Sequence, residues 1–204
     1  MSAVEERLVD AAAGLFYRRG IAATGVDTVA TESGVSKPTL YARFGTKDAL
    51  VVAVLNDRHR RRRASLEEHL RVRAALSPVE RMLSVFEWVA TQQRDDGARG
   101  CPFVNASVEL GRPQDGPARE VVGRHKRWFR GILADLAAEA GAAEPVILAS
   151  QVHLLIEGAN ARILAEADLT AVDDARRAAR LLVEVACPDT GTARAGARTG
   201  GTEQ

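Results

Sequence analysis

The sequence contains no long apolar run. No uncharged apolar stretch among its 204 residues approaches the ~20 residues that a membrane-spanning helix needs. The amino terminus also lacks the basic and apolar segments of a secretory signal, so we expect a cytoplasmic protein with no membrane partner. The two cysteines, Cys101 and Cys187, form no CxxC spacing and no Cys/His cluster. Their placement excludes a disulfide framework and a standard zinc site.

Aromatic residues and catalytic motifs are also scarce. Aromatic residues make up 4% of the chain, whereas hydrophobic residues make up 46% and alanine recurs throughout. This composition predicts an all-α globular protein. The sequence has no glycine-rich phosphate loop and no recognisable set of nucleophile, base and orienting residue, so we expect neither a cofactor nor an enzyme. An enzyme that uses Cys101 with His125 or His153 is the weakest alternative.

The net charge of the chain is only +1, but the charge is unevenly divided. Residues 1–63 contain 11 Lys and Arg against 7 Asp and Glu, a net +4. The remaining residues contain 17 against 20, a net −3. A basic amino-terminal part on an acidic body is typical of a protein that presents one end to phosphate.

The segment 24–47 carries the strongest motif. Apolar residues spaced three and four apart predict a short helix over residues 26–33, which Gly34 ends in a left-handed turn. Ser36 can cap a second helix, and Pro38 falls in its first turn, where a missing N–H costs little. Two short helices joined by a tight turn are typical of a helix-turn-helix.

A helical wheel of residues 37–44 places Leu40 and Phe44 on the buried side of the second helix. Lys37 and Arg43 lie nearer the core, with stems long enough to reach around the helix. The outward side carries small and hydroxyl side chains, which suit the major groove of DNA because threonine or alanine can contact a thymine methyl group. A helical hairpin within a bundle is the alternative that this pattern leaves open.

The run GVSKPTLYARFGTKDAL, which follows TGVDTVATES, resembles the TetR family of dimeric, ligand-responsive transcriptional repressors. The likeness is close over residues 4–56 and weaker beyond them. It implies that residues 36–44 enter the major groove and that Tyr41 and Lys47 touch phosphates. Gly25 departs from the family pattern, which often has a phosphate-binding Ser or Thr there. The predicted DNA contacts are Thr28, Ser36, Lys37, Pro38, Thr39, Tyr41, Ala42, Arg43 and Lys47.

Apolar stripes predict helices throughout the rest of the chain. They cover residues 4–19, 46–71, 78–96, 102–110, 117–140, 145–167 and 171–186. We expect residues 1–47 to form a helix-turn-helix DNA-binding domain and residues 48–187 to form a helical ligand-binding and dimerisation domain. Residues 188–204 are rich in glycine and threonine without an apolar anchor, which predicts a disordered tail.

A basic run follows in the long helix, from Arg58 to Arg63. Arg61 in this run lies about 21 Å along the helix axis from Lys47, because each residue of a helix rises about 1.5 Å. Most side chains cannot span that distance to reach the same DNA. We therefore favour a solvated helix face with Glu67 and Glu68 as partners over a second phosphate contact.

The segments 145–167 and 171–186 are too apolar for one side of a monomer. Small residues such as Ala159 would let another helix approach closely, so these segments predict a homodimer held by a four-helix bundle. The family resemblance implies the same arrangement. A two-fold dimer would bind a near-palindromic operator. His153 and Glu157, one turn apart, are either a polar pair inside that interface or ligand contacts.

We expect an apolar or amphipathic small-molecule inducer to bind among the helices of the body. Asn105 and Glu109, one turn apart on an apolar helix, are either a satisfied pair or part of the site. The long helix that begins at Thr46 would act as a lever that re-spaces the two DNA-binding heads. The candidate ligand contacts are Phe86, Trp88, Cys101, Phe103, Asn105, Trp128, Phe129, His153 and Glu157, although core packing is the simpler explanation for each aromatic residue taken alone.

Cys101 lies at the start of a helix, directly before Pro102 and two residues after Arg99. A helix amino terminus and a nearby cation both favour the thiolate, which reacts with electrophiles and oxidants. The run GCPFVNASVEL also resembles the corresponding stretch of TetR-like repressors that sense electrophiles through a cysteine. The alternative is a small buried residue that fills the turn.

The sequence therefore predicts a dimeric, sequence-specific DNA-binding regulator, a repressor by resemblance, that a small-molecule inducer or an electrophile releases from its operator. The main alternative is a helical protein-binding module that has lost DNA readout. Lys37, Thr39, Tyr41 and Lys47 argue against that alternative, because a module of this kind has no need to keep them.

Overall fold

The computed structural model describes residues 1–110 and 116–187, and these residues form an all-α fold. The segment 188–204, predicted to be a disordered tail, lies outside the described residues. The helices are α1 (Ala3–Arg19), α2 (Val26–Ser33), α3 (Lys37–Phe44), α4 (Lys47–Arg71), α5 (Pro78–Asp96), α6 (Pro102–Glu109), α7 (Gly116–Glu139), α8 (Pro145–Glu166) and α9 (Ala171–Ala186).

Helices α2 and α3 form the predicted helix-turn-helix. Gly34 adopts the left-handed conformation (φ +64°), and its N–H donates to carbonyls at the end of α2. Val35 is buried in the angle between the helices. The Ser36 side chain accepts from the Thr39 N–H and so caps α3. The turn is thus fixed by local chemistry that the sequence displays, and this prediction is confirmed.

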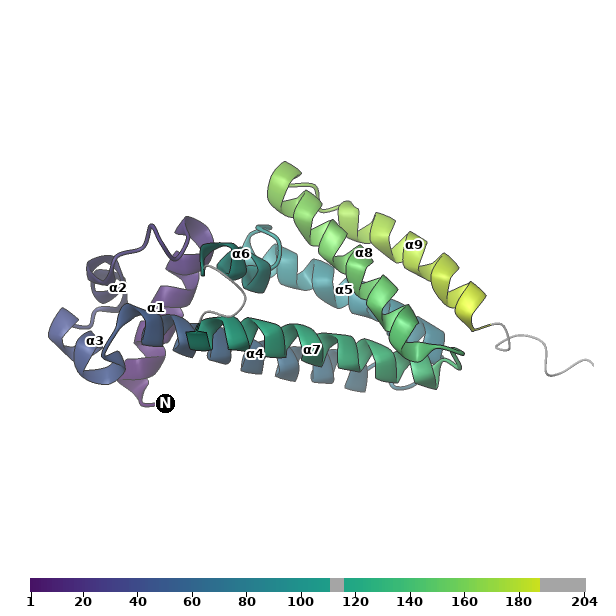
Figure 1. Cartoon of the computed structure of the whole chain (residues 1–204), viewed down its shortest axis with the longest axis horizontal. Coiled ribbons are helices and arrows are strands. Elements are labelled where there is room, and N and C mark those ends of the chain that lie inside the picture. Colours follow the sequence, from purple (N-terminus) through teal and green to yellow (C-terminus); the bar gives the residue numbers. More distant parts are fainter. Residues whose placement is uncertain (111–115, 188–204) are drawn as a thin grey trace, which may run out of the picture.

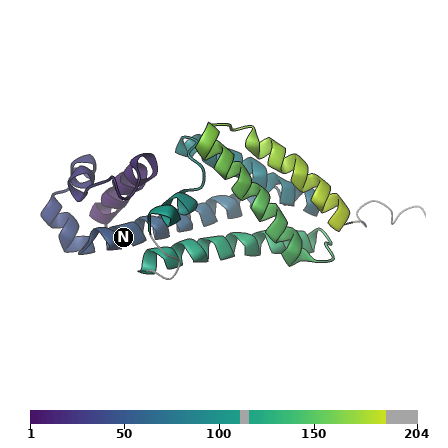
Figure 2. The ribbon, with the colours of Figure 1, turned by 45° about the horizontal axis from the view of Figure 1, so that its top comes forward.

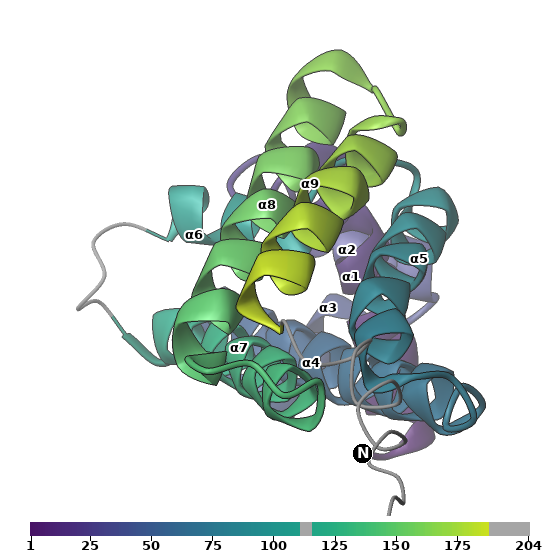
Figure 3. The ribbon, with the colours of Figure 1, turned by 90° about the vertical axis from the view of Figure 1, so that its right-hand side faces the viewer.

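The molecule is elongated, with α1–α3 at one end (Figure 1). Helix α4 starts in this head and runs along the long axis beside α7, and the turned view in Figure 2 shows the same pairing. Helices α8 and α9 lie side by side on the far end of the body (Figure 3). In the described part of the chain, no helix combines the length and hydropathy needed to cross a membrane.

The apolar interior is divided into two clusters, but the division does not fall at residue 47. The cluster that holds the head together contains Leu8 and Leu40, and it continues into Leu55 of α4, Phe103 of α6 and Val121 of α7. Because close-packed interiors transmit displacement, a shift of α6 is felt in the head. The core of the head thus extends past residue 47 into the first part of the body.

The basic run of α4 is not a solvated face, so that prediction is wrong for its inner members. Arg58 and Arg62 both bind the carboxylate of Asp96 on α5, and Arg62 is only 9% exposed. The outer members Arg60, Arg61 and Arg63 are exposed as predicted, and Arg63 forms a weak pair with Glu67 at 3.4 Å. The burial of Arg62 is tolerated because the carboxylate of Asp96 on the next helix pairs with it, which the periodicity of α4 does not indicate.

The apolar surface of α8 and α9 is split between the core and solvent. Leu154, Leu181 and Val185 are 67%, 65% and 83% exposed, so the chain leaves a large apolar face uncovered. Ala159, predicted to lie on that face, is instead buried inside the monomer, and so is His153. The two residues belong to the inward stripe of α8, because the outward stripe passes through Leu154.

Candidate nucleic-acid interface and ligand cavity

Most of the side chains predicted to contact DNA are exposed. Tyr41 is 42% exposed, and most of its neighbours on α3 are also exposed. Thr28, Thr39 and Lys47 are half-buried. The exposed members of the predicted set are Ser36, Lys37, Pro38, Tyr41, Ala42 and Arg43.

Lys37 forms an ion pair across the helix-turn-helix. Its Nζ lies 2.8 Å from a carboxylate oxygen of Asp27 on α2. The hydrogen bond to Asp27 raises the pKa of Lys37. The side chain is exposed instead of lying near the core as the helical wheel indicated. Lys37 therefore remains available to phosphate, because the exposed ion pair that it would give up contributes little to stability.

Lys47, the first residue of α4, is held in place by a backbone carbonyl of the head. Its Nζ donates to the carbonyl oxygen of Ile21 at 2.5 Å, and Thr46 caps the first turn of α4 by accepting from the Ala49 N–H. The ammonium group has three donors, so one bond to Ile21 leaves two for an anion. The loop that follows α1 thus positions the lysine that the resemblance assigns to phosphate.

The body is hydrogen-bonded to the head through Tyr17, near the end of α1. The Tyr17 hydroxyl donates to the carbonyl of Gly100 and accepts from the N–H of Arg99, both at 3.0 Å. Burial raises the pKa of Tyr17, so the phenol keeps its proton. Gly100 has a positive φ of 70°, and a Cβ there would lie 2.6 Å from the Asn160 carbonyl oxygen. Only glycine lets this loop pass between α1 and α8.

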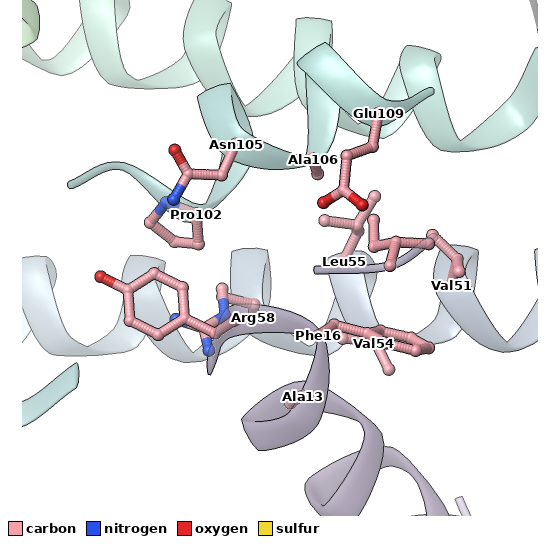
Figure 4. A pocket seen from close by; sticks show the side chains of 12 residues that line it. Ala13, Phe16, Val51, Val54, Leu55, Arg58, Pro102, Asn105, Ala106 and Glu109 are labelled. Atoms are coloured by element: carbon pink, nitrogen blue, oxygen red, sulfur yellow. The ribbon is translucent and has the colours of Figure 1, made fainter. Parts of the chain in front are cut away.

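Helix α6 makes a second contact with the head. A Glu109 carboxylate oxygen accepts from the backbone N–H of Ala22 at 2.8 Å, whereas Asn105 donates to the carbonyl of Arg99 at 2.8 Å. Asn105 and Glu109 therefore have separate partners and do not form the predicted pair. Both side chains face a small cavity of about 30 Å³ between α1, α4 and α6, opposite Phe16 and other apolar residues (Figure 4).

A second cavity lies inside the body, between α4, α5, α6, α7 and α8. Its volume is about 40 Å³, which holds one or a few waters but no drug-sized ligand. A ligand must therefore separate the surrounding helices to enter. The lining residues are Arg62, Trp88, Val89, Gln92, Gln93, Cys101, Pro102, Phe103, His125, Lys126, Phe129, Ile156, Glu157 and Asn160.

The structure brings together part of the predicted ligand set around this body cavity. The members that line it are Trp88, Cys101, Phe103, Phe129 and Glu157. Trp128 packs edge-on against His59, behind His125. Phe86 instead lines an open cleft beside Arg73, and Asn105 lines the small cavity next to the head. Of the predicted set, Phe86, Asn105, Trp128 and His153 therefore do not line the body cavity.

Cys101, Lys126 and Glu157 form a connected polar group on the cavity wall. The Lys126 Nζ lies 3.2 Å from the Cys101 sulfur and 2.7 Å from a Glu157 oxygen. Burial alone would lower the pKa of Lys126, but the thiol and the carboxylate together raise it above its usual value. The ammonium group is therefore charged and placed directly against the sulfur.

Two buried histidines lie beside this group. Burial lowers the pKa of His125 to about 2 and that of His153 to about 4, so both rings are neutral near pH 7. His125 stacks on Phe103 with ring centroids 3.6 Å apart. The Nε2 of His153 lies 3.5 Å from a Glu157 oxygen and has no hydrogen-bond partner among the described residues. His153 therefore faces the polar group and not a dimer interface.

Sequence reasoning missed several of the functional side chains. Lys126 lies four residues after Val122 and three before Phe129, on the apolar stripe of α7, and this spacing was an available signal for a buried cation. Arg62 carried no comparable signal, because its partner Asp96 belongs to another helix. Tyr17 is buried, but its two bonds to the body could not be read from spacing.

The comparisons with known proteins agree with this geometry. The family model for bacterial regulatory proteins of the tetR family matches residues 8–54, and the model for the tetracyclin repressor-like C-terminal domain matches residues 78–179. The uncharacterized HTH-type transcriptional regulator Rv1255c of Mycobacterium tuberculosis is 31% identical over 107 residues. That match covers 52% of this chain and 52% of the relative, so the chain spans about half the length of the curated relative.

Solved structures match over nearly the whole chain. The TetR-family regulator SCO4454 from Streptomyces coelicolor is 26% identical with a TM-score of 0.83, covering 90% of this chain and 96% of that one. A putative tetr-transcriptional regulator, sav143 from Streptomyces avermitilis, is 32% identical with a TM-score of 0.74, covering 91% and 98%. The helix-turn-helix, the helical body and these matches together show that the chain belongs to the TetR family.

Proposed function

We propose that this TetR-family protein is a homodimeric transcriptional repressor that binds a near-palindromic operator and releases it when a small molecule enters the body cavity. The observation that carries the proposal is the exposed face of α3, which is small, hydroxyl-bearing and flanked by Lys37, Arg43 and Lys47. Base edges in the major groove meet such a face without clash, while the basic residues meet phosphates.

The uncovered apolar face of α8 and α9 supports the dimer. Leu154, Leu181 and Val185 are exposed on neighbouring helices, and a two-fold copy would cover them with the same residues. Exposed apolar patches of this kind on a soluble protein mark interaction sites. Two heads fixed by such a bundle would read two half-sites about one turn of DNA, roughly 34 Å, apart.

The coupling between cavity and head runs through the segment that contains Arg99, Gly100 and Cys101. Cys101 lines the cavity, and the two residues before it bond to the Tyr17 hydroxyl in the head. Helix α6 follows directly and holds Ala22 through Glu109. A ligand that opens the cavity displaces this segment, which moves α1 and the recognition helix that α1 supports. The lever is therefore α6 and its preceding loop, together with α4.

The test is a gel shift with DNA from the region upstream of the protein's own coding sequence, because repressors of this class often control themselves or a neighbour. The proposal requires a shift that competing non-specific DNA does not abolish. It also requires that a cavity variant such as Phe129→Trp, which fills the space a ligand would use, binds the operator but no longer responds to ligand. Failure of the wild type to select any site supports the protein-binding module instead.

A second release mechanism is supported by the contact between Lys126 and Cys101. The Lys126 ammonium group lies 3.2 Å from the Cys101 sulfur, and both residues line the cavity through which an electrophile would reach them. An electrophile that adds to Cys101 would remove this contact and displace the loop that holds Tyr17. Treating wild type and Cys101→Ser with a quinone should release operator only from the wild type. Equal release from both proteins removes Cys101 from the mechanism.

A further inference from the structure

We infer that the body cavity takes an uncharged, mostly apolar molecule with a carbonyl group, and that this carbonyl accepts a hydrogen bond from the side-chain amide of Asn160. This inference rests on the proposed function for the regulatory role of the cavity. It adds the chemical class of the ligand, which follows from the direction of the hydrogen bonds and from the charges in the lining.

The amide of Asn160 has a fixed orientation. The backbone N–H of Gly100 can only donate, and it bonds to the side-chain oxygen of Gln93 at 3.1 Å. The side-chain nitrogen of Gln93 is therefore the end that faces Asn160, and it donates to the Asn160 Oδ1 at 2.8 Å. A chain of bonds that begins at a backbone donor thus occupies the oxygen of Asn160 and leaves its nitrogen, Nδ2, as the remaining group.

The Nδ2 of Asn160 is an unmet donor at the cavity wall. Within the described part of the chain, the side chain of Asn160 makes one hydrogen bond, the one that its oxygen accepts. The residue is only 8% exposed, and it lines the cavity together with Gln93. Among the described residues, the fully enclosed side-chain atoms without a partner are Arg81 Nε and His153 Nε2. The Asn160 nitrogen is not one of them, so it borders open space, which the cavity provides.

A second donor on the same wall favours a group that only accepts. The Lys126 ammonium group has three N–H donors, and its contacts with Cys101 and Glu157 use two of them. Glu157 and Asn160 are three residues apart on α8 and so share a face of that helix. A carbonyl oxygen has two lone pairs and can accept from both donors. A hydroxyl group would bring a hydrogen that needs a buried partner of its own.

The charges of the lining are already paired with one another. Arg62 binds Asp96, and Lys126 binds Glu157 at 2.7 Å. A charged ligand would lose its hydration and find no free counter-charge, because each of these ions has its partner. An anion placed at Asn160 would also lie within one helical turn of the Glu157 carboxylate and be repelled by it. The paired charges therefore select an uncharged ligand.

The rest of the wall is apolar. Trp88 and Phe129 line the cavity with ring centroids 5.8 Å apart, and Phe103 lines it while stacked on His125. The Nε1–H of Trp88 donates to Ser65 at 3.0 Å, so it does not compete for the polar group of a ligand. The part of the ligand beyond its carbonyl is therefore apolar, and a ring there gains aromatic contacts.

The same amides connect the carbonyl to the head. Gly100, whose N–H bonds to Gln93, also accepts from the Tyr17 hydroxyl through its carbonyl at 3.0 Å. A ligand that draws Asn160 toward itself shifts Gln93, and Gln93 holds the segment to which Tyr17 is bonded. Occupation of the cavity by a carbonyl compound should therefore lower operator affinity.

The experiment compares acetophenone with α-methylstyrene, in which a CH2 group replaces the carbonyl oxygen at nearly the same shape, and with benzoate, an anion. None of the three alkylates a thiol, so their binding is separate from any reaction of Cys101. The full-length protein is titrated with each probe at pH 7.5 in a calorimeter. The inference requires acetophenone to bind about tenfold more tightly than α-methylstyrene, the effect of one hydrogen bond in a buried site, and more tightly than benzoate. Equal binding of α-methylstyrene, tighter binding of benzoate, or no binding of acetophenone overturns the inference.

Two variants separate the role of Asn160 from general damage to the fold. Asn160→Asp keeps the oxygen that accepts from Gln93 and replaces the donor with an acceptor, whereas Asn160→Leu removes the polar group without adding a charge. In both variants the affinity for acetophenone should fall to that for α-methylstyrene, which should still bind. Asn56→Asp is the matched control, because it makes the same change on an exposed residue of α4 and keeps an acceptor for Arg124.

The control should keep the full preference for acetophenone. A preference that survives in both Asn160 variants overturns the assignment. Binding of acetophenone without any change in operator affinity leaves the ligand class standing and contradicts the proposed coupling.

Discussion

Removal of one oxygen atom from Tyr17 tests the connection between the head and the body. In Tyr17→Phe the ring remains, so its contact with the Arg58 guanidinium, 5.2 Å from the ring centroid, is retained. Only the hydroxyl is lost. The Arg99 N–H and the Gly100 carbonyl, both bound to that hydroxyl, are then left without their partner in a mostly buried site.

The expected magnitude follows from these two bonds. Each net hydrogen bond contributes about 1 kcal/mol, and a buried group left unpaired costs about 1–3 kcal/mol. We therefore expect Tyr17→Phe to lower the free energy of unfolding by about 2 kcal/mol. The loss of the connection should also narrow the difference in operator affinity between protein with an empty and a filled cavity.

The chain offers a matched control, since its only other tyrosine is Tyr41 on the recognition helix. Tyr41→Phe removes the same atom from a side chain that is 42% exposed, so stability should change by less than about 0.5 kcal/mol. Operator affinity should fall about fivefold instead, through one lost phosphate contact. Urea denaturation and fluorescence anisotropy measure the two effects. If both variants alter stability and DNA affinity alike, Tyr17 does not link the body to the head.

Three further predictions concern the DNA surface, the dimer and pH. Lys47→Ala should weaken binding to all DNA sequences and reduce the slope of log affinity against log salt by about 0.9 for each half-site. Thr39→Ala should instead change which DNA sequence is preferred. The opposite pattern contradicts the assigned geometry. Leu154→Arg, on the exposed face of α8, should give monomers in light scattering, and a mutant that stays dimeric places the interface elsewhere. Burial lowers the pKa of His153 to about 4, so the unfolded chain binds more protons than the folded chain below pH 6.5, and the free energy of unfolding falls as the pH drops. His153→Leu should remove about 2 kcal/mol of the loss in stability between pH 7.5 and pH 5. An unchanged pH profile of stability in this variant contradicts the account.

Local chemistry made the head predictable. The turn at Gly34, the cap at Ser36 and the buried Leu40 depend on residues within a few positions of one another, and the structure confirms all three. Ala42 on α3 is also exposed, as the helical wheel indicated. Short-range signals of this kind survive because no distant part of the chain competes with them.

The body was less predictable, because its polar partners come from helices far apart in sequence. Arg62 and Asp96 are paired across α4 and α5, and the position of Ala159 on the inner stripe of α8 depends on which neighbour covers it. Periodicity indicates that a face is apolar but not whether the same chain or a second copy buries it. The link from Tyr17 to Gly100 depends on a loop conformation that only the folded chain defines.

The most direct test of the central claim is selection of binding sites by the purified protein from a random pool of duplex DNA. A dimeric repressor of the proposed kind should enrich a near-palindrome whose half-sites are centred about one helical turn apart. A Lys37→Ala, Lys47→Ala double variant should enrich no sequence. Enrichment of a single asymmetric half-site, or of no sequence by the wild type, would contradict the proposal that two recognition helices read one operator.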